Sequence, residues 1–451
     1  MPNSHFNQLL ESAKFESIQY LDNCDNLPVF PSDEALKLLQ MFNEALPTDQ
    51  NNPLETLKKL ADIGSQTTVK HGGSRYFGFV NGGILPIGIA ARWLADTWDQ
   101  NAALSVMSPI AAKLEEVCQQ WLIQLLHLPP SSKMGLVGGT SVATLCGLAA
   151  ARNHQYKKLN WDINERGLAD APRLRIIMGD QTHGTVTKMV RLLGFGSQSI
   201  ELVASDDQGR IMVDCLPEID GSCILILQAG NVCSGSFDDF SALCSIANQS
   251  GAWTHIDGAF GLWAAASAQL KHLTVGMELA DSWSVDGHKT LNTPYDCGVI
   301  LCKHPDAITE ALHQQGSYID YSKTRDNMVY TPDMSRRARG IDLWACMHHL
   351  GENGIATLMN KLHEGAKYLA EHLNAIGYVV LNEIHFNQLI IHAGSEELTR
   401  QVLKRIQTSG VIWCGSATWK GQFIIRLSVC SWQTNEKDLA KAVEAFKTAL
   451  R

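Results

Sequence analysis

Apolar residues recur along this chain with two periods, which alternate through its middle part. Short apolar runs such as residues 173–180, 223–230 and 253–257 have the length and composition of buried strands, and longer patterns with helical spacing separate them. Strands that alternate with helices predict βαβ units and a mainly parallel sheet. We therefore expect residues 71–340 to form a large α/β domain.

The first 70 residues predict a helical arm with loops between its helices. Apolar side chains from Phe6 to Ala13 fall at helical spacing. Ser32, which follows a proline, has the composition of a helix N-cap and predicts a helix over residues 34–46.

The next segment is rich in glycine. Five glycines between residues 72 and 83 predict that residues 71–101 form a loop rather than a regular element. The aromatic side chains of Tyr76, Phe77 and Phe79 lie in this loop, where they either line a cavity or belong to the core. Ser108 precedes a proline and predicts the start of an amphipathic helix.

From Ile341 onward the pattern changes to that of a small α+β domain over residues 341–451. Helices are predicted over residues 351–377, 397–410 and 435–451, and strands over residues 378–384, 387–394 and 422–430. Three units over 451 residues agree with the usual size of domains.

Charge and cysteine usage narrow the class of protein. The net charge of −9 does not favour nucleic acid as a partner, and the tight basic cluster of Arg336, Arg337 and Arg339 is too small to change that expectation. Twelve cysteines lie mostly in apolar runs without a C-x-x-C pair, so we expect no metal site and a reducing, cytoplasmic environment. We also expect no signal peptide and no membrane span.

Two residues carry the candidate chemistry. Asp257 ends one apolar run, and Lys289 follows the next, within the sequence Asp286-Gly287-His288-Lys289. An acid at the end of one buried strand and a lysine past the next is an arrangement that holds pyridoxal phosphate (PLP): the lysine forms a Schiff base, and the acid pairs with the pyridine nitrogen. Each residue alone also has an ordinary interpretation, as a helix cap or as surface polarity.

In this order the motifs resemble those of the group II PLP-dependent amino-acid decarboxylases, which include aromatic-amino-acid, histidine and glutamate decarboxylases. The resemblance implies the aspartate-aminotransferase-like fold type I of PLP-dependent enzymes. It also implies that Lys289 binds the cofactor, that Asp257 is its pyridinium partner, that Ala259 packs against the ring, and that His288 lies beside the phosphate.

A glycine pair before a helix predicts an anion site. Backbone N–H groups at the helix start, beside the hydroxyls of Thr140 and Ser141, suit a phosphate, although such a start is often only a cap. The pattern is neither a P-loop nor G-x-G-x-x-G, which disfavours a nucleotide-dependent oxidoreductase. By resemblance, Gly139, Thr140 and Ser141 hold the cofactor phosphate.

The resemblance extends to three further positions. It implies that His183 stacks on the cofactor ring and takes part in the proton chemistry, and that Gln228 contacts the phenolic oxygen. Arg426 lies in an apolar strand and needs an anion, either the substrate carboxylate or a structural partner. Tyr76, Phe77 and Phe79 are the expected substrate contacts.

The chain departs from the family pattern at two places. A tyrosine that returns a proton after decarboxylation is expected near Asn327; Tyr330 is the nearest candidate, with Tyr318 and Tyr321 more distant. Asp286 stands where relatives often have Asn or Ser, and its carboxylate would repel a phosphate unless it is bridged or turned away.

The expected function is therefore PLP-dependent decarboxylation of an aromatic or otherwise uncharged L-amino acid to its amine by a homodimer whose sites lie between subunits. An aldehyde synthase, an aldolase, an aminotransferase and a non-catalytic PLP-binding protein remain alternatives.

Overall fold

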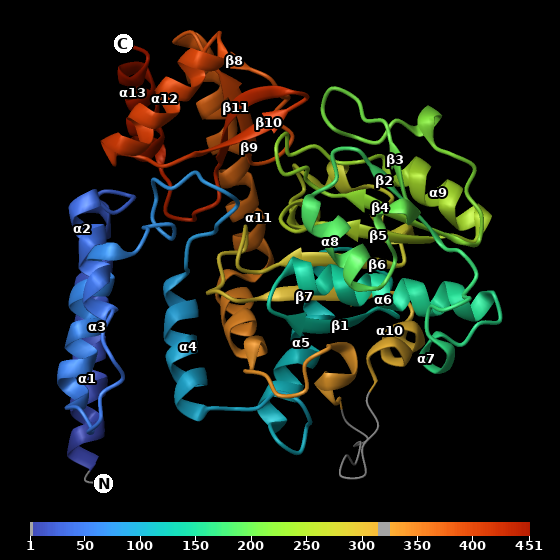
Figure 1. Cartoon of the computed structure of the whole chain (residues 1–451), viewed down its shortest axis with the longest axis horizontal. Coiled ribbons are helices and arrows are strands. Elements are labelled where there is room, and N and C mark those ends of the chain that lie inside the picture. The colour runs from blue at the N-terminus through green and yellow to red at the C-terminus, as the bar shows by residue number, and fades with distance from the viewer. Residues whose placement is uncertain (1–2, 314–324) are drawn as a thin grey trace.

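A seven-stranded sheet forms the centre of the computed structural model, which describes residues 3–313 and 325–451 (Figure 1). Its strand order is β1-β7-β6-β5-β4-β2-β3, and all of its strands are parallel except β7, which is antiparallel to both neighbours. The strands span β1 Lys133–Val137, β2 Arg175–Gly179, β3 Ile200–Val203, β4 Cys223–Gln228, β5 Trp253–Asp257, β6 Ser282–Asp286 and β7 Gly298–Cys302. The expected mainly parallel α/β architecture is confirmed.

Helices cover both faces of this sheet because its central strands are apolar on both sides. Ile224 and Ile226 of β4 face a core formed with α6, α8 and α10, whereas Leu225 and Leu227 face the larger core formed with α5, α9 and α11. These helices span α5 Pro109–Leu125, α6 Thr140–Lys158, α7 Ile163–Arg166, α8 Gly184–Leu192, α9 Phe240–Ser250, α10 Pro305–Leu312 and α11 Arg339–Ala375.

The register of the parallel strands brings their carboxyl ends to one edge. Gln228 at the end of β4 lies opposite Asp257 at the end of β5, and Asp257 lies opposite Ser284 of β6. Asp286 is the last residue of β6, and Lys289 follows in the next turn. Ligands of open α/β sheets bind at this edge.

The C-terminal part packs a second sheet against helices. Four antiparallel strands have the order β10-β11-β9-β8, and they span β8 Val379–Val380, β9 Gln388–His392, β10 Gly415–Trp419 and β11 Gln422–Ser428. Helices α12 Glu396–Ser409 and α13 Glu436–Ala449 complete this unit, and α11 runs into it from the large sheet with a break at Gly351, whose φ is 61°.

Two expectations here need correction. The strand predicted over residues 378–384 is only two residues long, and β10 was not predicted. All residues of β10 except Trp419 are exposed or half-buried, so no apolar run marks it in the sequence. The domain boundaries at residues 70/71 and 340/341 stay predictions, and α11 crosses the second of them.

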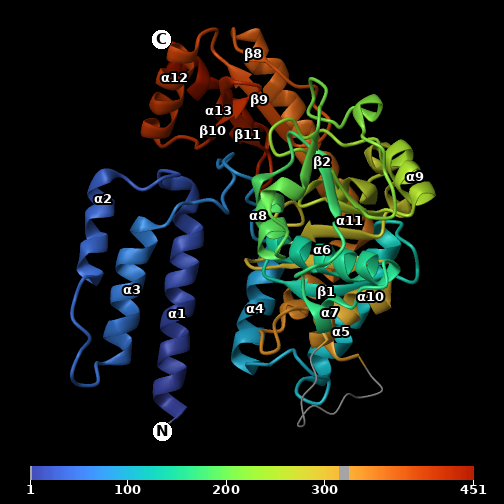
Figure 2. The same ribbon diagram turned by 45° about the vertical axis from the view of Figure 1, so that its right-hand side comes forward.

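The N-terminal helices stand beside the body of the molecule as an arm (Figures 1 and 2). They are α1 Asn3–Asn23, α2 Asp33–Lys37 and α3 Pro53–Thr67. Ser32 caps α2 as predicted, because its hydroxyl accepts a hydrogen bond from the Ala35 N–H at 3.2 Å. The helix predicted over residues 34–46 is too long: α2 gives way to a 3₁₀ helix over Leu38–Phe42.

The prediction of a loop over residues 71–101 is wrong for the second half of this segment, where α4 spans Pro86–Trp98. All five glycines that indicated a loop precede Pro86, which occupies the first turn of α4, where a missing N–H is tolerated. The helix predicted from Ser108 is confirmed, with the Ser108 hydroxyl accepting from the Ala111 N–H at 3.3 Å.

The basic cluster near residue 337 is internal. Arg336 pairs with Glu115 at 2.8 Å, while Arg337 and Arg339 both pair with Asp296, at 2.8 and 3.0 Å. These arginines therefore stabilise the packing of α11 and do not form a surface patch. Across residues 3–313 and 325–451, no helix is long and apolar enough to cross a membrane.

Candidate active site

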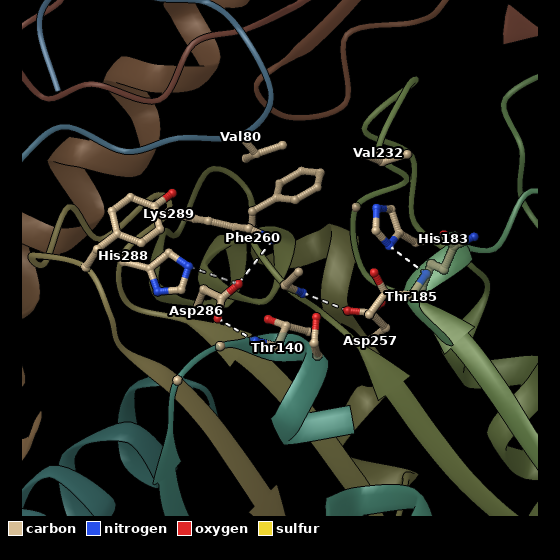
Figure 3. Close-up of a pocket in the computed structure, with 17 residues that line it drawn as sticks. Val80, Thr140, His183, Thr185, Val232, Asp257, Phe260, Asp286, His288 and Lys289 are labelled. Atoms are coloured by element: carbon tan, nitrogen blue, oxygen red, sulfur yellow. Dashed lines mark hydrogen bonds and ion pairs between the residues drawn. The ribbon is translucent and has the colours of Figure 1, made fainter. Parts of the chain in front are cut away.

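A cavity of about 340 Å³ lies at the carboxyl edge of the large sheet (Figure 3). Nine side chains or backbone positions that the sequence assigns to a cofactor site line it: Gly139, Thr140, Ser141, His183, Gln228, Asp257, Ala259, His288 and Lys289. They come from five separate segments, so the fold brings together residues up to 150 positions apart.

Asp257 is a buried carboxylate at the end of β5. Its oxygen accepts a hydrogen bond from the Ala259 N–H at 3.2 Å, and within the described part of the chain it forms no ion pair. Burial raises the pKa of Asp257, and the neighbouring Lys289 and His183 only partly oppose that rise. A buried carboxylate with spare acceptor capacity fits a protonated ring nitrogen.

Lys289 reaches the cavity from the turn after β6 (Figure 3). Its Nζ lies 3.1 Å from Oδ2 of Asp286, which keeps the ammonium beside the anion site. The glycine-rich loop packs on the backbone of this turn: a Cβ at position 82 would lie only 1.9 Å from the Lys289 carbonyl oxygen. Gly82 is therefore required by close approach of two backbone segments.

Two histidines face the cavity, and hydrogen bonds define their tautomers. The His288 Nδ1 accepts from the Cys297 N–H at 3.0 Å, and the His183 Nδ1 accepts from the Thr185 N–H at 3.2 Å. In both rings the proton therefore sits on Nε2. Burial lowers the pKa of both imidazoles, which favours their neutral forms.

The start of α6 fits a phosphate group. The Thr140 hydroxyl oxygen is buried there without a hydrogen-bond partner in the described residues, although it lines the cavity. A buried orphan hydroxyl at a helix N-terminus is a ready donor for an anion. A Cβ at Gly139 would come within 3.4 Å of the His288 ring, so glycine keeps this cup open. The residues present thus fit PLP at both its phosphate and its ring-nitrogen ends.

Sequence reasoning missed several lining residues. They are Val80, Thr185, Gly230, Val232, Phe260 and Tyr295. Tyr295 is the most polar of them; its hydroxyl donates to Asn81 Oδ1 at 3.1 Å, and its ring centroid lies 4.3 Å from that of His288. Burial raises the pKa of Tyr295, so the phenol stays protonated. Its position six residues after the lysine was the available signal.

Five predicted site residues do not line the cavity, namely Tyr76, Phe77, Phe79, Tyr330 and Arg426. Phe77 is fully buried in the main hydrophobic core and is no cavity contact, which corrects the expectation. Tyr330 ends a 3₁₀ helix, packs against the core beneath α6 and has Arg325 over its ring at 4.6 Å. It does not line the cavity of its own chain. Tyr318 and Tyr321 lie outside the described residues.

Arg426 contacts the cavity wall, and Tyr76 and Phe79 both stack on Trp413. The Arg426 Nη1 donates to the carbonyl of Val232, a lining residue, at 2.9 Å. Tyr76 stacks on Trp413 with centroids 5.1 Å apart, and Phe79 stacks on Trp413 at 5.7 Å. Burial raises the pKa of Tyr76 to about 12, and nearby Arg426 opposes the rise.

A mainly parallel sheet with a lysine, a buried aspartate and an anion-binding helix start at its carboxyl edge defines a PLP-dependent enzyme of fold type I. The family follows from comparison: the model of the pyridoxal-dependent decarboxylase conserved domain matches residues 36–388. The chain belongs to this family and is a PLP-dependent amino-acid decarboxylase, a carboxy-lyase.

Its relatives include decarboxylases and an enzyme that is named for an aldehyde product. An aromatic-L-amino-acid decarboxylase of Bacillus atrophaeus is 25% identical over 95% of this chain and 92% of its own length. A 4-hydroxyphenylacetaldehyde synthase of Rhodiola rosea is 27% identical over 73% of this chain and 71% of its own. The structure of Oryza sativa TDC with PLP and tryptamine has a TM-score of 0.92 at 22% identity, covering 100% of this chain and 99% of that one.

Proposed function

We propose that this enzyme converts an aromatic or otherwise uncharged L-amino acid to its amine. The carrying observation is the charge of the cavity wall: among its described lining residues, Lys289 is the single cation, and the cofactor takes it up. Arg426, which contacts the wall through Val232, is assigned below to the α-carboxylate, so an acidic side chain would find no further counter-ion. The similarity to aromatic-L-amino-acid decarboxylase supports the aromatic alternative.

The proposed roles of the lining residues follow their positions. Lys289 binds the cofactor aldehyde, and Asp257 pairs with the ring nitrogen. The proposed phosphate ligands and ring contacts are Gly139, Thr140, Ser141, Gln228, Ala259 and His288. When bound, PLP supplies an electron sink for the electron pair that decarboxylation leaves on the α-carbon.

Arg426 is the proposed partner of the substrate carboxylate. Among the described residues it makes no ion pair with a carboxylate, and burial lowers the pKa of its guanidinium. A buried cation without a protein anion is suited to an anionic ligand. Tyr76, Phe79 and Trp413 form the aromatic stack beside it, and we assign them to the substrate side.

His183 is the proposed residue on the face of the ring. Its neutral imidazole keeps a proton on Nε2, and its charge would be opposed by Lys289. It can therefore donate a hydrogen bond within the cavity without adding charge. Tyr330 remains a candidate proton donor only if it enters the active site of a second subunit.

The active form is proposed to be a cytoplasmic homodimer. The arm exposes a series of large apolar side chains on α1, namely Phe6, Leu10, Phe15, Ile18 and Leu21. Helix α4 likewise exposes Trp93, Leu94 and Trp98. Apolar surface of this extent favours a protein partner. Cytoplasmic location is supported by the twelve cysteines, all of which are free thiols.

The test is to incubate the purified, PLP-loaded enzyme with each of twenty amino acids and to record carbon dioxide, hydrogen peroxide and product mass. Carbon dioxide and an amine from aromatic or uncharged amino acids is the expected result. Turnover of glutamate alone would contradict the proposed substrate class.

Peroxide together with an aldehyde would instead support the second candidate, an aldehyde synthase. That candidate is favoured by one observation: Tyr295 is the sole tyrosine among the described residues that line the cavity, and it lies six residues after the lysine rather than in a distant loop.

A further inference from the structure

Asp286 lies beside the start of α6, at the proposed phosphate end of the cavity, and its carboxylate contacts three groups there (Figure 3). Oδ1 accepts a hydrogen bond from the Thr140 N–H at 2.7 Å. Oδ2 lies 3.1 Å from the Lys289 Nζ and 3.6 Å from the His288 Nε2. The side chain is 2% exposed, so these contacts replace its hydration.

The contact with Thr140 matters because this N–H is the first of α6. The amide groups of a first helical turn, with the partial positive charge of the helix dipole, are what binds an anion there. A carboxylate already pairs with one of these donors. Gly139 borders the same cup, since a Cβ on it would lie 3.7 Å from Asp286 Oδ1.

The other charges around Asp286 do not neutralise an additional anion. The ionisable groups that face it are Lys289, His288, Tyr295, Cys297 and Asp257. Of these, Lys289 is the cation, and its nitrogen would be committed to the aldehyde end of the cofactor, with which it would form the Schiff base. His288 is held neutral by burial, and Asp257 adds a second carboxylate. Arg337 and Arg339, farther back, are paired with Asp296.

We propose that Asp286 competes with the cofactor phosphate for the start of α6 and thereby sets how tightly this enzyme holds PLP. The proposal rests on the cofactor site described above and does not depend on which amino acid is the substrate. A carboxylate and a phosphate that share one set of donors repel each other, and burial strengthens that repulsion. An amide at position 286 would keep the hydrogen bond from Thr140 and remove the repulsion.

The experiment compares PLP with pyridoxal, which has the same aldehyde and ring but no phosphate. Dissociation constants of both are measured by absorbance of the Schiff base for the wild type, Asp286→Asn and Asp286→Ser. The release of PLP is followed by exchange with labelled PLP. Asp281→Asn serves as matched control, because Asp281 is also a buried carboxylate, bonded to the Thr254 N–H and His304 but outside the cavity. Circular dichroism checks that each variant is folded.

We expect Asp286→Asn to increase the affinity for PLP at least tenfold more than the affinity for pyridoxal, and to slow PLP release, whereas Asp281→Asn leaves both unchanged. Equal gains for the two ligands would mean that Asp286 acts only through Lys289, and would overturn the proposal. Weaker PLP binding in both variants would also overturn it, since the carboxylate would then help to hold the cofactor. Failure of the wild type to bind PLP would instead contradict the cofactor site itself.

Discussion

Buried ionisable side chains concentrate at the carboxyl edge of the sheet. The buried Asp257 and Asp286 share one cavity with the half-buried Lys289, although burial of charge is costly. Such clustering marks a functional site, because the charges serve a ligand rather than the fold.

Replacement of Lys289 by alanine tests the central assignment. We expect Lys289→Ala to lose the borohydride-reducible link to PLP and to lower carbon dioxide release by on the order of a thousandfold or more, because the covalent partner of the cofactor is removed. Mass spectrometry after reduction and a carbon dioxide assay check this. Lys271→Ala, in a distant 3₁₀ helix, should keep both properties. A reducible link retained in Lys289→Ala would point to another lysine.

A buried histidine outside the site predicts how stability depends on pH. His255 on β5 is fully buried, its Nδ1 lies 2.8 Å from the Ser282 hydroxyl, and burial lowers its pKa from 6.5 to about 3. Between these values the unfolded chain binds a proton that the folded chain does not. The contribution of His255 to the free energy of unfolding is therefore fully present above pH 6.5. It is lost as the pH decreases toward 3, by about 1.4 kcal/mol per pH unit.

Chemical denaturation at a series of pH values measures this effect. In His255→Gln, which keeps a hydrogen-bonding side chain, the slope between pH 4 and 6 should be shallower by about one proton's contribution. An unchanged slope would show that other groups dominate acid unfolding.

At the level of elements, hydrogen bonds to one side chain connect the glycine-rich loop before α4 to its neighbours. The Gly83 N–H donates to Asn292 Oδ1 at 2.8 Å, and the Trp432 N–H donates to the same oxygen at 2.8 Å. Asn292 thus connects this loop, the turn after Lys289 and the C-terminal unit.

Replacement of Gly82 by alanine should therefore move the turn that carries Lys289. We expect Gly82→Ala to weaken PLP binding at least tenfold, because its Cβ would overlap the Lys289 carbonyl oxygen. Absorbance titration with PLP measures this. The control is Gly64→Ala in α3, where a Cβ has no neighbour within 4 Å and should be neutral or slightly stabilising. Normal PLP affinity in Gly82→Ala would show that the loop can shift freely.

For the whole molecule, the apolar faces of the arm and of α4 predict how the chain assembles. Phe15 and Ile18 are 60% and 45% exposed on α1. We expect the double variant Phe15→Asp/Ile18→Asp to weaken the proposed homodimer at least tenfold while each chain stays folded, because charge is introduced into an apolar interface. Analytical ultracentrifugation over a concentration series measures this.

The matched control is Lys14→Asp/Glu11→Lys, which changes exposed residues of the same helix that pair with each other at 3.1 Å. It should leave the assembly unchanged. A monomeric wild type, or a double variant that dimerises normally, would remove the arm from the interface.

The sequence by itself determined the class of fold and most of the cofactor site. Short continuous apolar runs identify β2, β4, β5 and β6, because strands that are buried on both faces are apolar throughout. Asp257 and Lys289 stand out because they are polar residues at the ends of such runs. The glycine pair before Thr140 marks the anion site by its local chemistry alone.

Only the tertiary structure determined which side chains from distant segments of the chain lie in contact. Phe77 and Phe79 are two residues apart, yet Phe77 is buried in the core and Phe79 is exposed beside Trp413, a partner more than 300 positions later in the chain. The role of Asp286 was open for the same reason: whether its charge is bridged depends on Thr140, which another segment supplies. Local periodicity encodes burial and element type, whereas contacts between distant segments depend on how the elements pack.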